Sequence, residues 1–279
     1  GFSVFGMGHY VDSDLDSDVD RTGYRSRTEG ATIGFDYRLS DEFFVGLAGG
    51  FGFSQVDFAG GRGDADVTTG MVGPFFSFAQ GRFFADGWVL GGLSDYELDR
   101  NVFFDGFAAR PEGNTDGWNL TASLGGGYQL DAGSWTFGPT GRLTYTKVEV
   151  DGLTERDGGE AALRIRDFGG ESLRSELGMR ASYQAKFGWG CLVPEARARW
   201  VHEFVDEDIT NMATFSQAPT APVMSIRSPR VDGRDSALLG AGLNAFVKQR
   251  ANAYLYYDAE VGREEQTTHG VHMGFRVRF

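Results

Sequence analysis

The residues that most suggest chemistry are the acids at every second position of the segment Asp12–Asp20. Carboxylates at that spacing could hold Ca²⁺, but a calcium-binding loop also needs a glycine at its sixth position. The sixth position from the first acid is Ser17, and from the second acid it is Val19, so neither start fits. We therefore expect a solvated acidic surface loop without a specific metal site.

The other residue types that could catalyse a reaction or bind a cofactor lack the necessary spacing. The four histidines show no metal-ligand spacing. Serine, histidine and aspartate occur without a nucleophile elbow, and the single cysteine, Cys191, has no recognisable base beside it. The segment Gly240–Ala245 matches a loose dinucleotide fingerprint, but no βαβ unit surrounds it. We expect no catalytic residues, no metal and no cofactor, and hence no enzyme.

The composition of the 279 residues argues against two classes of protein. A net charge of −13 opposes nucleic-acid binding, which needs clustered lysine and arginine. No stretch approaches the roughly 20 apolar residues of a membrane-spanning helix, and the mean hydropathy is low at −0.29. A membrane barrel is still compatible with this value, because only every second strand residue faces lipid.

Apolar and polar residues alternate with the two-residue period of a β-strand. Between positions 118 and 130 most even positions are apolar, and the odd positions are polar or glycine. Likewise Leu173, Leu177 and Tyr183 share one face, and Arg174 and Glu176 share the other. Full charges on the polar face, with aromatic residues at strand ends, favour a membrane barrel over a soluble sandwich.

The connections between these strands alternate between short and long. We expect tight turns at Leu39–Glu42, Gln80–Arg82, Asp131–Ser134, Gly188–Gly190 and Lys248–Asn252. We expect long acidic or glycine-rich loops at Asp12–Arg27, Ala59–Asp66, Asp99–Asp116, Asp151–Glu171, Asp206–Arg234 and Arg263–Thr267. Short turns at one rim and long loops at the other are typical of outer-membrane barrels.

The strands between these connections number about 12, an even count that puts both chain ends on the short-turn side. No linker or change of composition divides the chain. The sequence therefore predicts an all-β fold: a membrane-spanning, closed, antiparallel up-and-down β-barrel of 12 strands that forms one domain over residues 1–279.

The charged residues on the polar faces are the candidate functional site. We expect them to line a hydrated pore, where they either brace the wall through salt bridges or also cradle a transiting chain or a plug helix. The candidate pore-lining residues are Asp36, Arg38, Arg142, Arg174, Glu176, Arg180, Glu195, Arg197, Arg199, Glu203, Asp258 and Glu260. Arg276 and Arg278 lie on the same polar face.

The last eight residues end in an aromatic side chain with apolar residues at alternate positions before it. The candidate assembly signal consists of Gly274, Phe275, Val277 and Phe279. It resembles the terminal signal by which Gram-negative barrels are recognised for membrane assembly. Physically it is an edge strand that can pair with another sheet edge while its apolar face meets lipid.

Several segments together resemble the autotransporter barrel family. They are Gly30–Asp41, Gly46–Ser54, Ser172–Arg180, Trp200–Phe204 and Arg234–Leu243, and their order matches the family across essentially the whole chain. The resemblance implies a barrel in the bacterial outer membrane that carries an upstream passenger segment, with an α-helix threading the pore. Because Gly1-Phe2 already has the character of a strand, we expect the passenger and the linker helix to be absent from this chain.

The leading hypothesis is therefore an outer-membrane translocator that supports export of an upstream passenger to the cell surface. The partners it implies are outer-membrane lipid and lipopolysaccharide, the barrel-assembly machinery and the passenger, with no nucleic acid. The alternatives are a passive porin or channel, and a surface-binding protein that uses its long loops. The gene sequence upstream of Gly1 distinguishes these hypotheses best.

Overall fold

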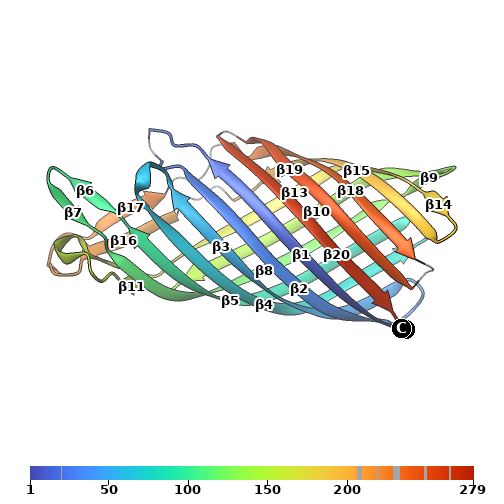
Figure 1. Cartoon of the computed structure of the whole chain (residues 1–279), viewed down its shortest axis with the longest axis horizontal. Helices are drawn as coiled ribbons and strands as arrows, with labels where there is room; N and C mark the ends of the chain where they lie inside the picture. Colours follow the sequence, from blue (N-terminus) through green and yellow to red (C-terminus); the bar gives the residue numbers. More distant parts are fainter. Residues whose placement is uncertain (20, 206–208, 219, 229–232, 248–249, 264) are drawn as a thin grey trace.

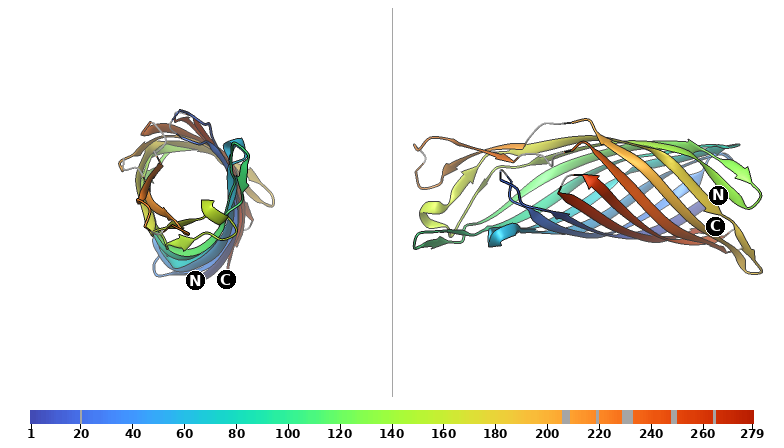
Figure 2. Two further views of the ribbon diagram at one scale, coloured as in Figure 1. Left: turned by 90° about the vertical axis from the view of Figure 1, so that its left-hand side faces the viewer. Right: turned by 90° about the horizontal axis from the view of Figure 1, so that it is seen from above.

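The alternating strands build one sheet that closes on itself. The computed structural model describes residues 1–279 except 20, 206–208, 219, 229–232, 248–249 and 264. Twelve long antiparallel strands form a closed barrel, in which the first strand pairs with the last and the ring is completed between β13 and β15. Seen end-on, the strands form a ring, and from the side they run obliquely to the long axis (Figures 1 and 2). The predicted fold class is confirmed.

The barrel strands are longer than the alternating segments alone suggested. They are β1 (Phe2–Leu15), β2 (Tyr24–Arg38), β3 (Phe43–Phe58), β4 (Gly63–Gln80), β5 (Phe83–Arg100), β8 (Glu112–Tyr128), β10 (Trp135–Val150), β13 (Phe168–Tyr183), β15 (Gly190–Glu203), β18 (Asp235–Val247), β19 (Ala251–Arg263) and β20 (Gln266–Arg278). Two short strands, β9 (Leu130–Ala132) and β14 (Ala185–Phe187), extend the sheet.

The two ends of the barrel differ as the connections predict. Tight turns gather at one end, here called the turn rim, and the first and last residues lie there too (Figure 2). The longer connections gather at the opposite end, the loop rim. Parts of the connection 206–234 and of the turn 248–252 lie outside the described residues.

Two of the predicted long loops are wrong. Between β3 and β4 the chain turns at a 3₁₀ turn, η1 (Ala59–Gly61), and β4 starts at Gly63, well before the predicted end of the loop at Asp66. Likewise β19 and β20 nearly meet, with Arg263 paired to Gln266. In both places polar residues that suggested a loop belong to strands that continue beyond the apolar part of the sheet.

The acidic segment is also corrected in part. Asp12 and Asp14 belong to the outward face of β1, whereas Asp16 and Asp18 follow the end of the strand at Leu15. Arg25 of β2 lies 3.1 Å from Asp12, and Arg27 lies 3.7 Å from it. These cross-strand pairs extend the hairpin up to Leu15, and Asp20 lies outside the described residues.

The loop rim carries additional sheet structure. The connection after β5 forms a hairpin of β6 (Val102–Phe104) and β7 (Phe107–Ala109). The connections after β10 and β15 together form a four-stranded loop sheet in the order β11 (Leu153–Thr154), β12 (Leu163–Ile165), β16 (Ile209–Phe215) and β17 (Met224–Ser228). A second 3₁₀ turn, η2 (Gly159–Ala161), lies between β11 and β12.

The loop sheet has a small apolar core of its own. Leu153, Ala162, Leu163 and Ala213 are all buried in it. Because the connection 151–167 contributes three of these buried residues, it is ordered structure at the loop rim.

Among the described residues, no helix is long and apolar enough to cross a membrane.

Candidate functional site: the two faces of the barrel wall

The outer face of the barrel is an apolar band. Large apolar side chains at alternate positions are exposed there, among them Ile33 (72%) and Leu93 (74%). From Phe83 to Leu93 of β5, or from Trp135 to Tyr145 of β10, the outward positions carry no charge. Such a length matches the about 9–11 residues that a tilted strand needs to cross the apolar layer of a membrane.

Aromatic side chains mark both borders of this band. Tyr37, Tyr128, Trp135 and Tyr183 stand at the turn rim, and Trp135 packs edge-on against Tyr183 with ring centroids 5.0 Å apart. Trp200 lies at the border towards the loop rim. Two such girdles are the usual boundary of a barrel with the lipid headgroups.

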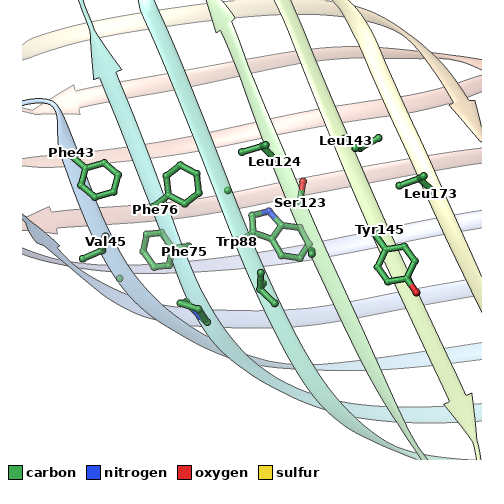
Figure 3. A pocket seen from close by; sticks show the side chains of 15 residues that line it. Phe43, Val45, Phe75, Phe76, Trp88, Ser123, Leu124, Leu143, Tyr145 and Leu173 are labelled. Carbon is green, nitrogen blue, oxygen red and sulfur yellow. The ribbon is translucent and has the colours of Figure 1, made fainter.

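The outer face also contains a shallow apolar hollow of about 640 Å³. Side chains of β3, β4, β5, β8, β10 and β13 border it, including Phe43, Phe76, Leu124 and Leu143 (Figure 3). Outward residues with small side chains, such as Ala122, lie among its larger neighbours, and the Phe76 ring packs over Gly87, where a Cβ atom would stand 2.5 Å from the ring. Lipid chains fit such a hollow as well as any specific ligand does.

The inner face carries most of the predicted site residues as ion pairs between strands. Glu176 of β13 accepts from Nη1 of Arg199 on β15 at 2.8 Å. Arg174 of β13 donates to Glu260 of β19 at 2.7 Å, although β15 and β18 lie between them in the sheet. A contact that skips two strands is only possible on the concave side of a curved sheet.

Two more pairs cross a strand at a glycine. Arg197 of β15 donates from Nε to Asp258 of β19 at 2.9 Å, directly above Gly240 of β18. Arg142 of β10 reaches Asp86 of β5 at 2.5 Å, over Gly125 of β8. A Cβ atom at Gly125 would stand 2.8 Å from the Arg142 guanidinium carbon. The glycines therefore make room for the long side chains.

The remaining predicted residues make other kinds of contact than close ion pairs. Arg180 and Glu195 are 3.9 Å apart, and Arg180 lies over the ring of Phe84. Glu203 is buried and accepts hydrogen bonds from the Ser172 hydroxyl and the Leu173 backbone N–H, so it fastens β15 to β13 near the loop rim.

Asp36 and Arg38 lie near the turn rim. Asp36 is only 2% exposed, and its carboxylate is 3.3 Å from Arg276 of β20, which also covers the ring of Phe5. Arg38 lies over the ring of Phe44. Whether all twelve residues line a passage in the working protein stays a prediction.

Sequence reasoning missed inner-face residues that complete these contacts. Asp86 pairs with Arg142, Ser236 donates to Glu260, and Tyr256 underlies the Arg197 guanidinium. The alternation could have found Asp86, because it stands between Phe84 and Trp88 on the face opposite Leu93.

The inner wall is uneven in chemistry. On β13, β15 and β19 it is densely charged, as the pairs above show. On β3, β4 and β5 the inward positions are mostly small or apolar, including Gly50, Met71 and Leu90. Phe75 of β4 reaches Phe5 of β1 edge-on at 5.5 Å. One part of the wall thus offers apolar contacts and another part offers charges.

The closing seam between β1 and β20 contains the predicted assembly signal. Phe275 lies over Gly6, where a Cβ atom would stand 3.0 Å from the ring, and the Phe279 N–H donates to the Phe2 carbonyl. Phe275 and Phe279 are both exposed on the outer face. Gly274 lies on the inner face beneath Tyr254.

At the loop rim the connections are tied to the barrel by charge. Arg100 donates to both carboxylate oxygens of the buried Glu155, at 2.9 and 2.7 Å. Arg110 donates to Asp99 at 2.6 Å, and this hydrogen bond raises the pKa of the Arg110 guanidinium.

The residue types that could hold a metal are dispersed. His9 and His272 face each other across the seam on the inner face, and His202 and His269 lie on the outer face. Within the described ranges, no group of three or more His, Cys, Asp and Glu side chains is arranged to hold a metal ion. Cys191 is a free, half-buried thiol.

Comparison with protein families gives a match to the autotransporter beta-domain over residues 4–258. Among curated proteins, esterase EstA of Pseudomonas aeruginosa is 29% identical over 220 residues, which is 76% of this chain and 32% of EstA. The chain thus spans about a third of the length of such relatives.

Solved structures show the same fold. The translocator domain of the autotransporter NalP from Neisseria meningitidis superposes with a TM-score of 0.78 at 15% identity, covering 100% of this chain and 88% of NalP's. The beta domain of the Bordetella autotransporter BrkA gives 0.72 at 16% identity, covering 100% and 99%.

Proposed function

The chain belongs to the autotransporter beta-domain family, a family of Gram-negative outer-membrane barrels, and from this premise we propose that it is a translocator supporting export of an upstream passenger to the cell surface. The observation that carries the proposal is the closed barrel of 12 strands with an apolar outer band and a charged inner wall. A barrel of this size lies between the 8-stranded barrels that side chains fill and the 16-stranded porins with aqueous channels. One helix or one extended chain fits such a passage, whereas a folded domain does not.

The twelve predicted pore-lining residues support this proposal through their chemistry. A passage lined by charges of both signs stays hydrated, because taking each charge out of water costs several kcal/mol, which pairing only partly offsets. The uneven wall also suits an amphipathic linker helix, which would place its apolar side on β3–β5 and its polar side on β13–β19. The helix and the passenger are implied by the family.

The proposed partners follow from the two faces and the seam. The apolar band would meet outer-membrane lipid, and the charged outer positions at the loop rim would meet lipopolysaccharide. The last strand, with Phe275, Val277 and Phe279 facing outward and Gly274 inward, would be recognised by the barrel-assembly machinery. We propose no catalytic role for the barrel, since an activity named for a longer relative, such as esterase, is a property of that whole protein.

Surface display of the full-length gene product tests the proposal. Cells expressing the whole gene should expose the passenger to proteinase K added outside, and cells expressing the gene without residues 1–279 should not. As a control, supplying the barrel as a separate polypeptide should not restore display, because a translocator acts on the chain to which it is attached. A passenger that reaches the surface without the attached barrel contradicts the proposal.

The part of the gene upstream of Gly1 distinguishes a translocator from a passive porin. A gene that encodes only a signal peptide before Gly1 leaves nothing to export and supports a passive channel. Uptake of small solutes into cells or vesicles would then be the activity to measure.

A further inference from the structure

The mouth of the barrel at the turn rim holds a cavity of about 900 Å³. Inward-facing residues from both sides of the closing seam line it, together with residues of β2 and of the turn before β19. Its charged side chains are Asp36, Arg38, Arg250, Arg276 and Arg278. Four guanidinium groups thus share one opening with a single acidic side chain and with the terminal residue Phe279.

The single acid does not neutralise this opening. Asp36 is buried and already lies 3.3 Å from Arg276. Arg38 approaches only Asp41, at 3.7 Å, and Asp41 is almost fully exposed in a turn, where water and salt screen the pair. Within the part of the chain that the structure describes, Arg250 and Arg278 have no ion-pair partner within 4 Å, and Asp36 is the only acidic side chain that lines the cavity, beside the α-carboxylate of Phe279. Three exposed guanidinium groups thus share the opening with one terminal carboxylate, and the cavity keeps an excess of positive charge.

The rest of the molecule makes this cluster unusual. The chain as a whole carries a net charge of −13. Deeper along the inner wall Arg174, Arg197 and Arg199 each have a carboxylate within 3 Å. A concave opening with an excess of one sign of charge concentrates counter-ions, because its low-dielectric walls focus the field.

We propose that the turn-rim mouth is an anion-binding vestibule, which takes soluble polyanions bearing sulfonate, phosphate or carboxylate groups. Arg38, Arg250 and Arg278 bind the anion, and Arg276 is held in place by Asp36. The site lies inside the ring of strands, so a water-soluble anion reaches it and a lipid headgroup in the surrounding layer does not. The vestibule goes beyond the translocator function and does not depend on it.

Binding of the trisulfonate dye pyranine to the refolded chain in neutral detergent tests the vestibule. Fluorescence anisotropy gives the dissociation constant at rising NaCl concentration, and phospholipid-free detergent removes headgroups as a source of anions. Wild type should bind, with an affinity that falls as salt rises. The Arg38→Gln/Arg278→Gln double variant should bind at least about tenfold more weakly, since two of three nearby charges are lost.

The Arg25→Gln/Arg82→Gln double variant is the matched control. It removes the same charge from positions that do not line the cavity, and it should bind as wild type does. Heat-modifiable migration on gels shows that each variant is folded. No binding by the folded wild type, or equal weakening in both double variants, overturns the proposal, and passenger display measured separately is unaffected by either result.

Discussion

Single charged side chains in this barrel are held by partners on other strands. Arg197 and Asp258 belong to strands separated by β18, and Arg174 and Glu260 are separated by two strands. A buried ion pair adds little net stability, because desolvation offsets the attraction, but loss of one partner leaves an unpaired charge. We therefore expect such pairs to determine which strands lie together more than they raise overall stability.

A residue-scale prediction concerns the last side chain. Replacing Phe279, which is 80% exposed on the outer face, with aspartate places a charge on the apolar band and alters the terminal signal. The amount of heat-modifiable barrel in the outer-membrane fraction should fall several-fold. Phe103→Asp makes the same change at an exposed site of the loop-rim hairpin and should leave the amount unchanged. Equal amounts for both variants would refute the role of Phe279.

The faces of single residues were predictable, and their partners were not. Ile33 and Leu93 point outward because the side-chain period of a strand is two, which the sequence displays directly. The pairing of Arg174 with Glu260 depends on how far neighbouring strands are shifted along each other, and an alternating pattern does not contain that shift.

At the scale of a strand, glycine sets where long side chains can cross. Gly240 lies beneath the Arg197–Asp258 pair, and a Cβ there would stand 2.7 Å from Arg197 Nε. Gly240→Val should break the pair and lower the free energy of unfolding by roughly 2–4 kcal/mol. Gly91→Val is the control, because nothing lies within 4 Å of a Cβ at Gly91. Urea unfolding of the refolded barrel is followed by tryptophan fluorescence. The midpoint should move to a lower urea concentration for Gly240→Val and stay unchanged for Gly91→Val.

The loop sheet gives a second element-scale prediction. Glu155 joins the connection 151–167 to the barrel, accepting from Arg100 and from the Leu163 N–H. Glu155→Ala should free this connection, so that trypsin cleaves it at least about tenfold faster while the barrel stays heat-modifiable. Glu160→Ala removes an exposed acid of the same connection and should cleave at the wild-type rate. Equal cleavage of both variants would show that Glu155 does not anchor the connection.

The loop sheet could not be predicted from the sequence. Its strands β11 and β12 are only a few residues long, and β12 pairs with β16 of a different connection. Short strands show no clear alternation, and pairing between distant connections leaves no local signal. The opposite error, loops predicted at Ala59–Asp66 and Arg263–Thr267, arose because strand ends outside the lipid need not be apolar.

At the scale of the whole molecule the two rims carry clusters of opposite charge. On the outer face near the loop rim, carboxylates of four neighbouring strands stand side by side in the register, Asp57, Asp64, Asp99 and Glu112. At the turn rim, Arg38, Arg250 and Arg278 face the mouth. The negative net charge therefore does not describe the entrance that a molecule meets from the turn-rim side.

The last prediction concerns the open state of the whole barrel. The paired charges on β13, β15 and β19 call for water or a polar segment beside them, because a dry interior would leave part of their hydrogen-bonding capacity unused. Residues 1–279 refolded alone should conduct ions in planar bilayers, and the same barrel with its natural upstream segment should conduct less, since a helix in the passage displaces water. Single-channel recordings of both proteins at equal salt provide the measurement. Equal conductance would contradict the hypothesis of a plug helix. No conductance from either protein would mean that side chains alone fill the barrel.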